Sequence, residues 1–158
     1  MTIAIAAPAW LVGIFLLLLA IAAVEDGWRL RISNLIVLGV AATGAAAMAF
    51  AGIGWGVWQP LLLALAILAI GTPLFSAGWL GGGDVKLLAA SATWFMLDGG
   101  WRMLVAVAII GGVLTLIALL LRRFQPRNSS IALLRRGVGV PYGIAIAIGV
   151  SSIILWSR

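Results

Sequence analysis

The 158-residue sequence contains no cysteine and no histidine. These absences exclude disulfides, thiolate catalysis and zinc sites built on Cys, and they remove the commonest metal ligand and proton shuttle. Acids are scarce as well, because Asp and Glu together number 4 against 10 Lys and Arg. The remaining side-chain chemistry is that of a few carboxylates, and we expect it to need no metal and no cofactor.

Charge of either sign is rare. Charged residues make up 9% of the chain, hydrophobic residues make up 65%, and the mean hydropathy is +1.25. Such a composition is typical of an integral membrane protein. No charged residue lies between Ile32 and Gly83, a stretch much longer than the ~20 apolar residues that one helix needs to cross a bilayer. This stretch therefore holds more than one span.

The apolar segments predict an all-α membrane protein of one domain (1–158) with six transmembrane helices. The expected spans are residues 3–24, 35–51, 60–73, 84–97, 103–121 and 140–156. Pro73 is expected to end or kink the third span. Asp98-Gly99-Gly100 is expected to close the fourth, which then covers only ~20 Å of a ~30 Å apolar core. Asp84, at the start of this short span, should lie slightly below the membrane surface.

The first span has one competing interpretation. Ala20-Ile21-Ala22 resembles the processing site of a cleaved signal peptide. However, no Lys or Arg precedes the apolar run, and the run is long for a signal core. We therefore expect a retained span.

The basic residues predict the orientation, because cytoplasmic loops are enriched in Lys and Arg. One side of the predicted topology holds Arg29, Arg31, Lys86, Arg122, Arg123, Arg127, Arg135 and Arg136, and the other holds Arg102 and Arg158. The first side should be cytoplasmic, with both termini on the non-cytoplasmic side. The basic loop 122–136 is expected to contact anionic lipids.

Tryptophans at positions 28, 55, 58, 79, 101 and 156 lie near predicted span ends, as in an interfacial belt.

Asp84 is the most informative residue, because it follows Gly81, Gly82 and Gly83 at the head of a membrane helix. A charge among membrane spans costs roughly 2.5–3.5 kcal/mol on insertion scales and marks a pathway, a relay or a reaction site. The glycines allow another backbone to approach, which suits presentation of the carboxylate to a peptide. The alternative is a turn that ends in a helix-capping Asp.

A second acid is predicted on the same membrane face. Asp26 follows the first span, and Glu25 beside it is its competitor, although only one of the two neighbours can face the bundle comfortably. Paired carboxylates that share a proton can activate water and polarise a carbonyl, which is aspartyl protease chemistry. The exposed N–H groups at a helix start favour an ionised Asp84, so we expect Asp84 to be the base and Asp26 the acid.

These residues resemble the type IV prepilin peptidases, membrane aspartyl proteases with a Gly-x-Gly-Asp motif. Gly81-Gly82-Gly83-Asp84 fits the motif, and Val85-Lys86 fits its frequent continuation. Asp26 resembles the first family aspartate. Ser33-Asn34 stands where many members have Pro-Asn, so Ser33 is a departure. Pro141-Tyr142-Gly143 resembles the family's Pro-Tyr-Gly at the start of the last helix.

The resemblance implies a peptidase that removes the basic leader of a membrane-bound prepilin at the cytoplasmic face of the bacterial inner membrane. Asp26 and Asp84 would be catalytic. The substrate-binding or motif-supporting residues would be Gly81, Gly82, Gly83, Lys86, Asn34, Pro141, Tyr142 and Gly143.

The compact chain resembles the peptidases of tight-adherence, Flp-type pili, and the archaeal preflagellin peptidases are a second possible match. Larger members methylate the new N-terminus through a region with Cys motifs, so N-methylation is not expected here. The prepilin and the lipid bilayer are the expected partners, and nucleic acid is not.

Two other classes remain open at this stage. A six-span transporter could use Asp26 and Asp84 as a proton or ion relay. A catalytically silent assembly protein would share the same composition and topology.

Overall fold

A computed structural model of the chain describes residues 2–52, 54, 56–124 and 140–157, and the described part is all-helical, as predicted. The basic segment 125–136 and Trp55 lie outside the described residues. A short 3-10 helix, η1 (Ile3–Ile5), precedes the α-helices. These are α1 (Ala9–Arg29), α2 (Asn34–Ala51), α3 (Trp58–Ser76), α4 (Gly82–Ala92), α5 (Leu97–Phe124) and α6 (Tyr142–Trp156).

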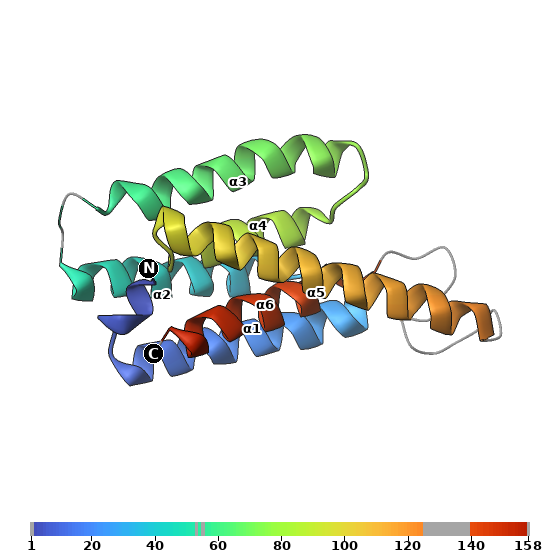
Figure 1. Ribbon diagram of the computed structural model, residues 1–158, viewed down its shortest axis with the longest axis horizontal. Helices are drawn as coiled ribbons and strands as arrows, with labels where there is room; N and C mark the ends of the chain where they lie inside the picture. The colour runs from blue at the N-terminus through green and yellow to red at the C-terminus, as the bar shows by residue number, and fades with distance from the viewer. Residues whose placement is uncertain (1, 53, 55, 125–139, 158) are drawn as a thin grey trace.

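The helices run up and down along the long axis of one bundle (Figure 1). Both chain termini lie at one end, which we call the terminal end, and there the Thr2 and Ser157 hydroxyls are 2.6 Å apart. The last turn of α1, the α3–α4 connection and the start of α6 lie at the other end, which we call the distal end (Figure 1). Which end faces the cytoplasm stays a prediction.

Among the described residues, four helices are long and apolar enough to cross a membrane: α1, α2, α3 and α5. The 15 residues of α6 fall short of that length. The 11 residues of α4 span roughly 16 Å, about half of the apolar core of a bilayer. The fourth helix is therefore short, as predicted, while six complete crossings stay a prediction.

The first helix is shifted relative to the predicted span 3–24. Residues 2–7 instead lie against the segment that follows the C-terminal end of α4. There Ile3 N–H donates to Trp94 O at 2.9 Å, and Ala4 is fully buried. Pro8 then caps α1. At its other end α1 continues through the polar run 25–29, because Asp26 is buried inside the bundle rather than exposed in a turn.

Two further boundaries differ from the predictions. Pro73 lies inside α3, which continues to Ser76, and the neighbouring Thr72 hydroxyl donates to Leu68 O at 2.6 Å. Asp98-Gly99-Gly100 does not form a closing turn, because it belongs to the first turn of α5. An acidic side chain in a first turn is favoured by the exposed backbone N–H groups there, so Asp98 suits a helix start.

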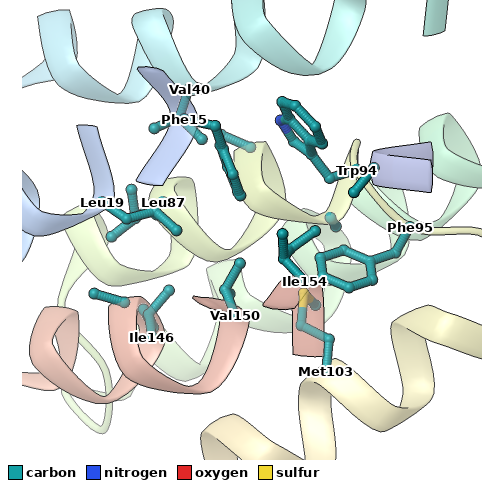
Figure 2. Packing of buried hydrophobic residues seen from close by; sticks show 14 of the residues in the cluster. Phe15, Leu19, Val40, Leu87, Trp94, Phe95, Met103, Ile146, Val150 and Ile154 are labelled. Carbon is teal, nitrogen blue, oxygen red and sulfur yellow. The ribbon is translucent and has the colours of Figure 1, made fainter. Parts of the chain in front are cut away.

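The core surrounds α4, which packs against α2, α3 and α6. Leu87 on α4 is fully buried, and the rings of Phe15 and Trp94 stack with centroids 4.4 Å apart (Figure 2).

Large apolar side chains also cover the outside of the bundle, as lipid contact requires. Exposed tryptophans lie near helix ends, with Trp10, Trp58, Trp101 and Trp156 toward the terminal end and Trp28 and Trp79 toward the distal end. The positions near helix ends agree with the prediction for Trp28, Trp58, Trp79, Trp101 and Trp156, while their location at a membrane interface stays a prediction.

The close approach of α2 to the end of α4 depends on Gly44. A Cβ at this position would overlap Thr93 Oγ1, which is fixed by its own hydrogen bond to Ala90 O at 2.6 Å. We expect Gly44→Ala to lower the free energy of unfolding by about 1–3 kcal/mol through overpacking. Gly13→Ala is the matched control, since a Cβ there meets no atom within 4 Å, and it should be neutral or stabilising by up to ~1 kcal/mol. Denaturant unfolding in detergent measures both, and equal effects would contradict the packing assignment.

Candidate active site

Asp26 is a buried carboxylate on the last turn of α1, with only 4% of its surface exposed. Its Oδ2 accepts the backbone N–H of Gly143 at 2.7 Å. Gly143 is the second residue of α6, and a Cβ on it would lie 2.8 Å from the same oxygen. The glycine therefore lets the first turn of α6 approach the carboxylate directly. Pro141 is buried immediately before this turn.

Asp84 is held by the helix that it begins. Gly81 is the N-cap of α4, Asp84 is the third helical residue, and the Asp84 carboxylate lies beside Gly81, whose backbone N–H favours its charged form. This reach from the third residue back to the cap is one half of a capping box. A Cβ on Gly81 would lie 2.6 Å from Asp84 Oδ2. The first glycine of the motif thus leaves the space that the carboxylate occupies.

The two carboxylates border the same space at the distal end. Asp26 and Asp84 together line a polar cavity of about 600 Å³ and a smaller one of about 230 Å³. They are close enough for the charge of Asp26 to act on Asp84. Gly81, Gly82 and Gly83 line the smaller cavity, and Tyr142 lines the larger. Their catalytic and substrate-binding roles stay predictions.

Both acids lie beside the start of a helix. The Asp84 carboxylate lies beside the Gly81 N-cap of α4, and Asp26 accepts the Gly143 N–H in the first turn of α6. The sequence-based reason for choosing Asp84 as the base, a carboxylate at a helix start, therefore applies equally to Asp26.

A hydrogen bond to the turn between α1 and α2 holds Glu25, which does not line either cavity. Ser33 N–H donates to Glu25 Oε2 at 2.9 Å, and Ser33 Oγ accepts the Ile36 N–H at 3.4 Å as the N-cap of α2. The φ of Ser33 is −68°, which proline would also adopt. Ser33 thus keeps a proline-like backbone and adds a hydrogen bond to Glu25 that proline, without an N–H, cannot donate.

Lys86 lies outside the cavities. Its Nζ donates to Asn34 Oδ1 at 3.2 Å on the exposed surface. This contact joins the fifth residue of α4 to the first residue of α2. Lys86 and Asn34 therefore connect the two segments that flank the carboxylates, and neither lines a cavity with Asp26 or Asp84.

Several cavity residues were not predicted from the sequence. Leu30 ends α1 with a φ of 53° and lines both cavities, while Trp79 and Thr115 line the larger one. Nothing in the apolar pattern distinguishes Leu30 or Thr115 from their neighbours, since their positions follow from how the helices pack. In the described part of the chain, no cluster of three or more His, Cys, Asp or Glu side chains is present that could hold a metal ion.

The fold and this site define a polytopic helical membrane protein with two carboxylates gathered at one end of its bundle. The sequence matches the type IV leader peptidase family over residues 13–120, which is more than half of the 158 residues. The chain belongs to this family, and it is thus a leader-peptidase-like protease. The matched region includes Asp26 and Asp84, whereas Pro141-Tyr142-Gly143 lies beyond it. Comparisons with curated proteins and with solved structures gave no match.

The contact between the α1–α2 turn and the glycine motif (Gly81–Gly83) can be tested without an activity assay. A Cβ at position 83 would lie 3.2 Å from Ile32 Cβ, close to the ~3.5–4.5 Å of disulfides. Because the chain has no cysteine, we expect Ile32→Cys/Gly83→Cys to cross-link on mild oxidation. Maleimide labelling of the denatured protein, with and without reductant, measures the cross-link.

The control pair is Ile32→Cys/Gly82→Cys, because a Cβ at position 82 faces Phe75 of α3 instead. Persistent labelling of the first pair after oxidation, or equal cross-linking of both pairs, would contradict this contact.

Proposed function

We propose that the protein is an aspartyl endopeptidase that removes the leader peptide of type IV, Flp-type prepilins at the cytoplasmic face of the bacterial inner membrane. One observation carries the proposal. Asp26 and Asp84 come from helices far apart in the sequence and line one polar cavity at the end of a membrane bundle. Membership in the leader peptidase family supports the reaction class.

The proposed reaction uses the two carboxylates as a pair that shares one proton. The ionised member takes a proton from a water molecule, whose oxygen attacks the carbonyl carbon of the scissile peptide. The protonated member donates its proton to the carbonyl oxygen, which gives a neutral tetrahedral intermediate. Collapse of that intermediate returns a proton to the leaving amine and breaks the C–N bond. No metal, nucleotide or covalent intermediate is required, and no N-methyltransferase activity is proposed.

The orientation is supported by charges near the carboxylates. Arg29, Arg31 and Lys86 are exposed at the distal end, and α5 ends there soon after Arg122 and Arg123 in the sequence. Arg102 is near the start of α5 at the terminal end. An excess of Lys and Arg favours the cytoplasmic side. A leader that is cytoplasmic and basic would reach the cavity from this side.

The positions of the acids favour a peptidase over a proton relay. A relay needs ionisable groups at successive depths across the bilayer. The chain has four acidic residues. Glu25, Asp26 and Asp84 lie at the distal end, and Asp98 lies in the first turn of α5 at the terminal end. Paired acids on one side of the membrane suit hydrolysis of a peptide presented from that side.

Replacement of either carboxylate tests the two-acid reaction. We expect Asp26→Asn and Asp84→Asn each to lower kcat/KM by about 100- to 10,000-fold, the usual weight of general acid–base groups. The assay follows cleavage of a leader-bearing prepilin by the purified protein in detergent or liposomes. Asp98→Asn, at the terminal end, is the matched control and should cleave at the wild-type rate. Undiminished cleavage by either site variant would overturn the mechanism.

Gly143 offers a test of how Asp26 is positioned. We expect Gly143→Ala to lower kcat/KM by about 100-fold, because its Cβ would displace the carboxylate that now lies 2.8 Å away. Gly112→Ala is the control, since a Cβ at Gly112 meets no atom within 4 Å. Thermal unfolding of both variants separates a loss of positioning from a loss of fold. Wild-type cleavage by a folded Gly143→Ala protein would refute the role of this hydrogen bond.

A further inference from the structure

Glu25 comes immediately before Asp26 on α1, but its carboxylate binds the turn after the helix and lines neither carboxylate cavity. Glu25 Oε2 accepts the backbone N–H of Ser33 at 2.9 Å, and the Glu25 side chain is 21% exposed. Its contact with Arg29 is longer, 4.0 Å from Oε1 to Nη1, and the Arg29 side chain is 77% exposed. An exposed ion pair of that kind contributes little. The hydrogen bond to Ser33 is therefore the interaction through which Glu25 acts on the fold.

This hydrogen bond spans the segment that forms one wall of the smaller cavity. One side of that cavity is the start of α4, residues 81–84. The other side consists of four residues from the end of α1 and the turn after it: Asp26, Leu30, Arg31 and Ile32. All four lie between Glu25 and Ser33 in the sequence. A bond between the two ends of this segment therefore restrains the wall that faces the glycine motif.

The turn in this segment needs such a restraint. Leu30 has a φ of 53°, in the left-handed region that is unfavourable for a residue with a side chain. A conformation of this kind persists only where surrounding contacts hold it. Two residues further on, Ile32 lies against the glycine motif, where a Cβ on Gly83 would lie 3.2 Å from Ile32 Cβ. A turn that relaxed would thus move away from the residue that precedes Asp84.

We propose that Glu25 is a positioning residue, whose hydrogen bond to Ser33 N–H holds the α1–α2 turn against the glycine motif and so keeps Asp26 and Asp84 at the cavities that they share. This inference rests on the proposed peptidase function. Glu25 touches neither the attacking water nor the peptide, because it acts through the turn. What position 25 must supply is therefore an acceptor oxygen, and neither a negative charge nor a proton.

Proline at position 33 would hold the turn in another way. The φ of Ser33 is −68°, which is the value that a proline ring imposes. Proline has no N–H, so a turn fixed by its ring needs no acceptor at position 25. Removal of the Glu25 carboxylate, whose oxygen is 2.9 Å from the Ser33 nitrogen, also makes room for the ring. Proline should thus replace the hydrogen bond in a protein that lacks the Glu25 carboxylate.

Substitutions at position 25 separate positioning from catalysis. We expect Glu25→Ala to lower kcat for prepilin cleavage by about 10- to 100-fold, because the carboxylates lose their alignment, and to change KM by less. Glu25→Gln should retain most of the wild-type kcat, since its amide oxygen accepts the same N–H. A catalytic Glu25 would instead lose activity equally in both variants. Arg29→Gln is the control for the ion pair and should cleave at the wild-type rate.

Exchange of Ser33 provides the rescue. Glu25→Ala/Ser33→Pro should recover most of the kcat that Glu25→Ala loses. Glu25→Ala/Ser33→Ala is the matched control, because alanine also removes the Ser33 hydroxyl but does not fix φ, and it should stay as slow as Glu25→Ala. Each kcat is measured well below the unfolding temperature of the variant, so that a loss of stability does not lower it.

The position of the turn can also be measured without a substrate. In the Ile32→Cys/Gly83→Cys protein, we expect Glu25→Ala to slow disulfide formation severalfold, because the turn no longer stays against the glycine motif. Glu25→Gln should leave the rate of disulfide formation unchanged, since the hydrogen bond to Ser33 N–H remains.

Each outcome decides between the claims. A wild-type kcat in Glu25→Ala, equal losses in Glu25→Ala and Glu25→Gln, or no recovery with proline would overturn the positioning role while leaving the peptidase intact. If the wild-type protein cleaves no prepilin, the peptidase function is refuted, and slower cross-linking in Glu25→Ala would still support the hold of Glu25 on the turn. If Glu25→Ala does not fold, Glu25→Ala/Ser33→Pro decides: cleavage near the wild-type rate supports the proposal, and loss of cleavage rules it out.

Discussion

The hydrogen bond from Gly143 N–H to Asp26 is the interaction on which the arrangement of the site depends. A carboxylate buried in an apolar bundle is costly unless it is paired or hydrogen-bonded. Asp26 is 4% exposed, and the donor that it uses comes from a helix 117 positions further along the chain. The bond forms only if α6 packs along α1, as it does. The same packing brings Tyr142 to the larger cavity that the two carboxylates line.

The short length of α4 imposes a second constraint on the fold. Its first turn must present Asp84 at the distal end, yet 11 residues reach only about halfway across the bilayer. Non-helical backbone at membrane depth is tolerated only where it is buried in protein. Residues 2–7 supply that cover, because Ile3 N–H bonds to Trp94 O and Thr2 pairs with Phe95. The N-terminal segment thus covers the non-helical residues that follow α4.

Much of this architecture could be predicted from the sequence. Long uncharged runs indicate membrane helices, and the short interval between Asp84 and Asp98 predicts a short fourth helix. The errors arose where tertiary contacts override local signals. The polar run 25–29 reads as a turn, but burial of Asp26 keeps it helical. Asp98-Gly99-Gly100 reads as a helix end, although the same residues suit a helix start.

The hydrogen-bond partners of the site could not be predicted, because they depend on contacts between distant segments. A glycine in the sequence can mark a turn, a flexible point or a close contact. Only the fold shows that Gly81 and Gly143 each leave space for a carboxylate oxygen. Ser33 likewise reads as a departure from the family pattern, and the structure shows a serine with a proline-like φ that also donates to Glu25.

Asp84 lies where two spaces of different polarity meet. One is the larger cavity that it shares with Asp26, and the other, among α3, α4, α5 and α6, is lined by apolar side chains apart from Asp84 and Tyr142. In the proposed reaction, the first of these spaces would admit the water that attacks the peptide. The three glycines before Asp84 allow close packing around its helix start, because a Cβ on Gly81, Gly82 or Gly83 would meet Asp84, Phe75 or Ile32, respectively.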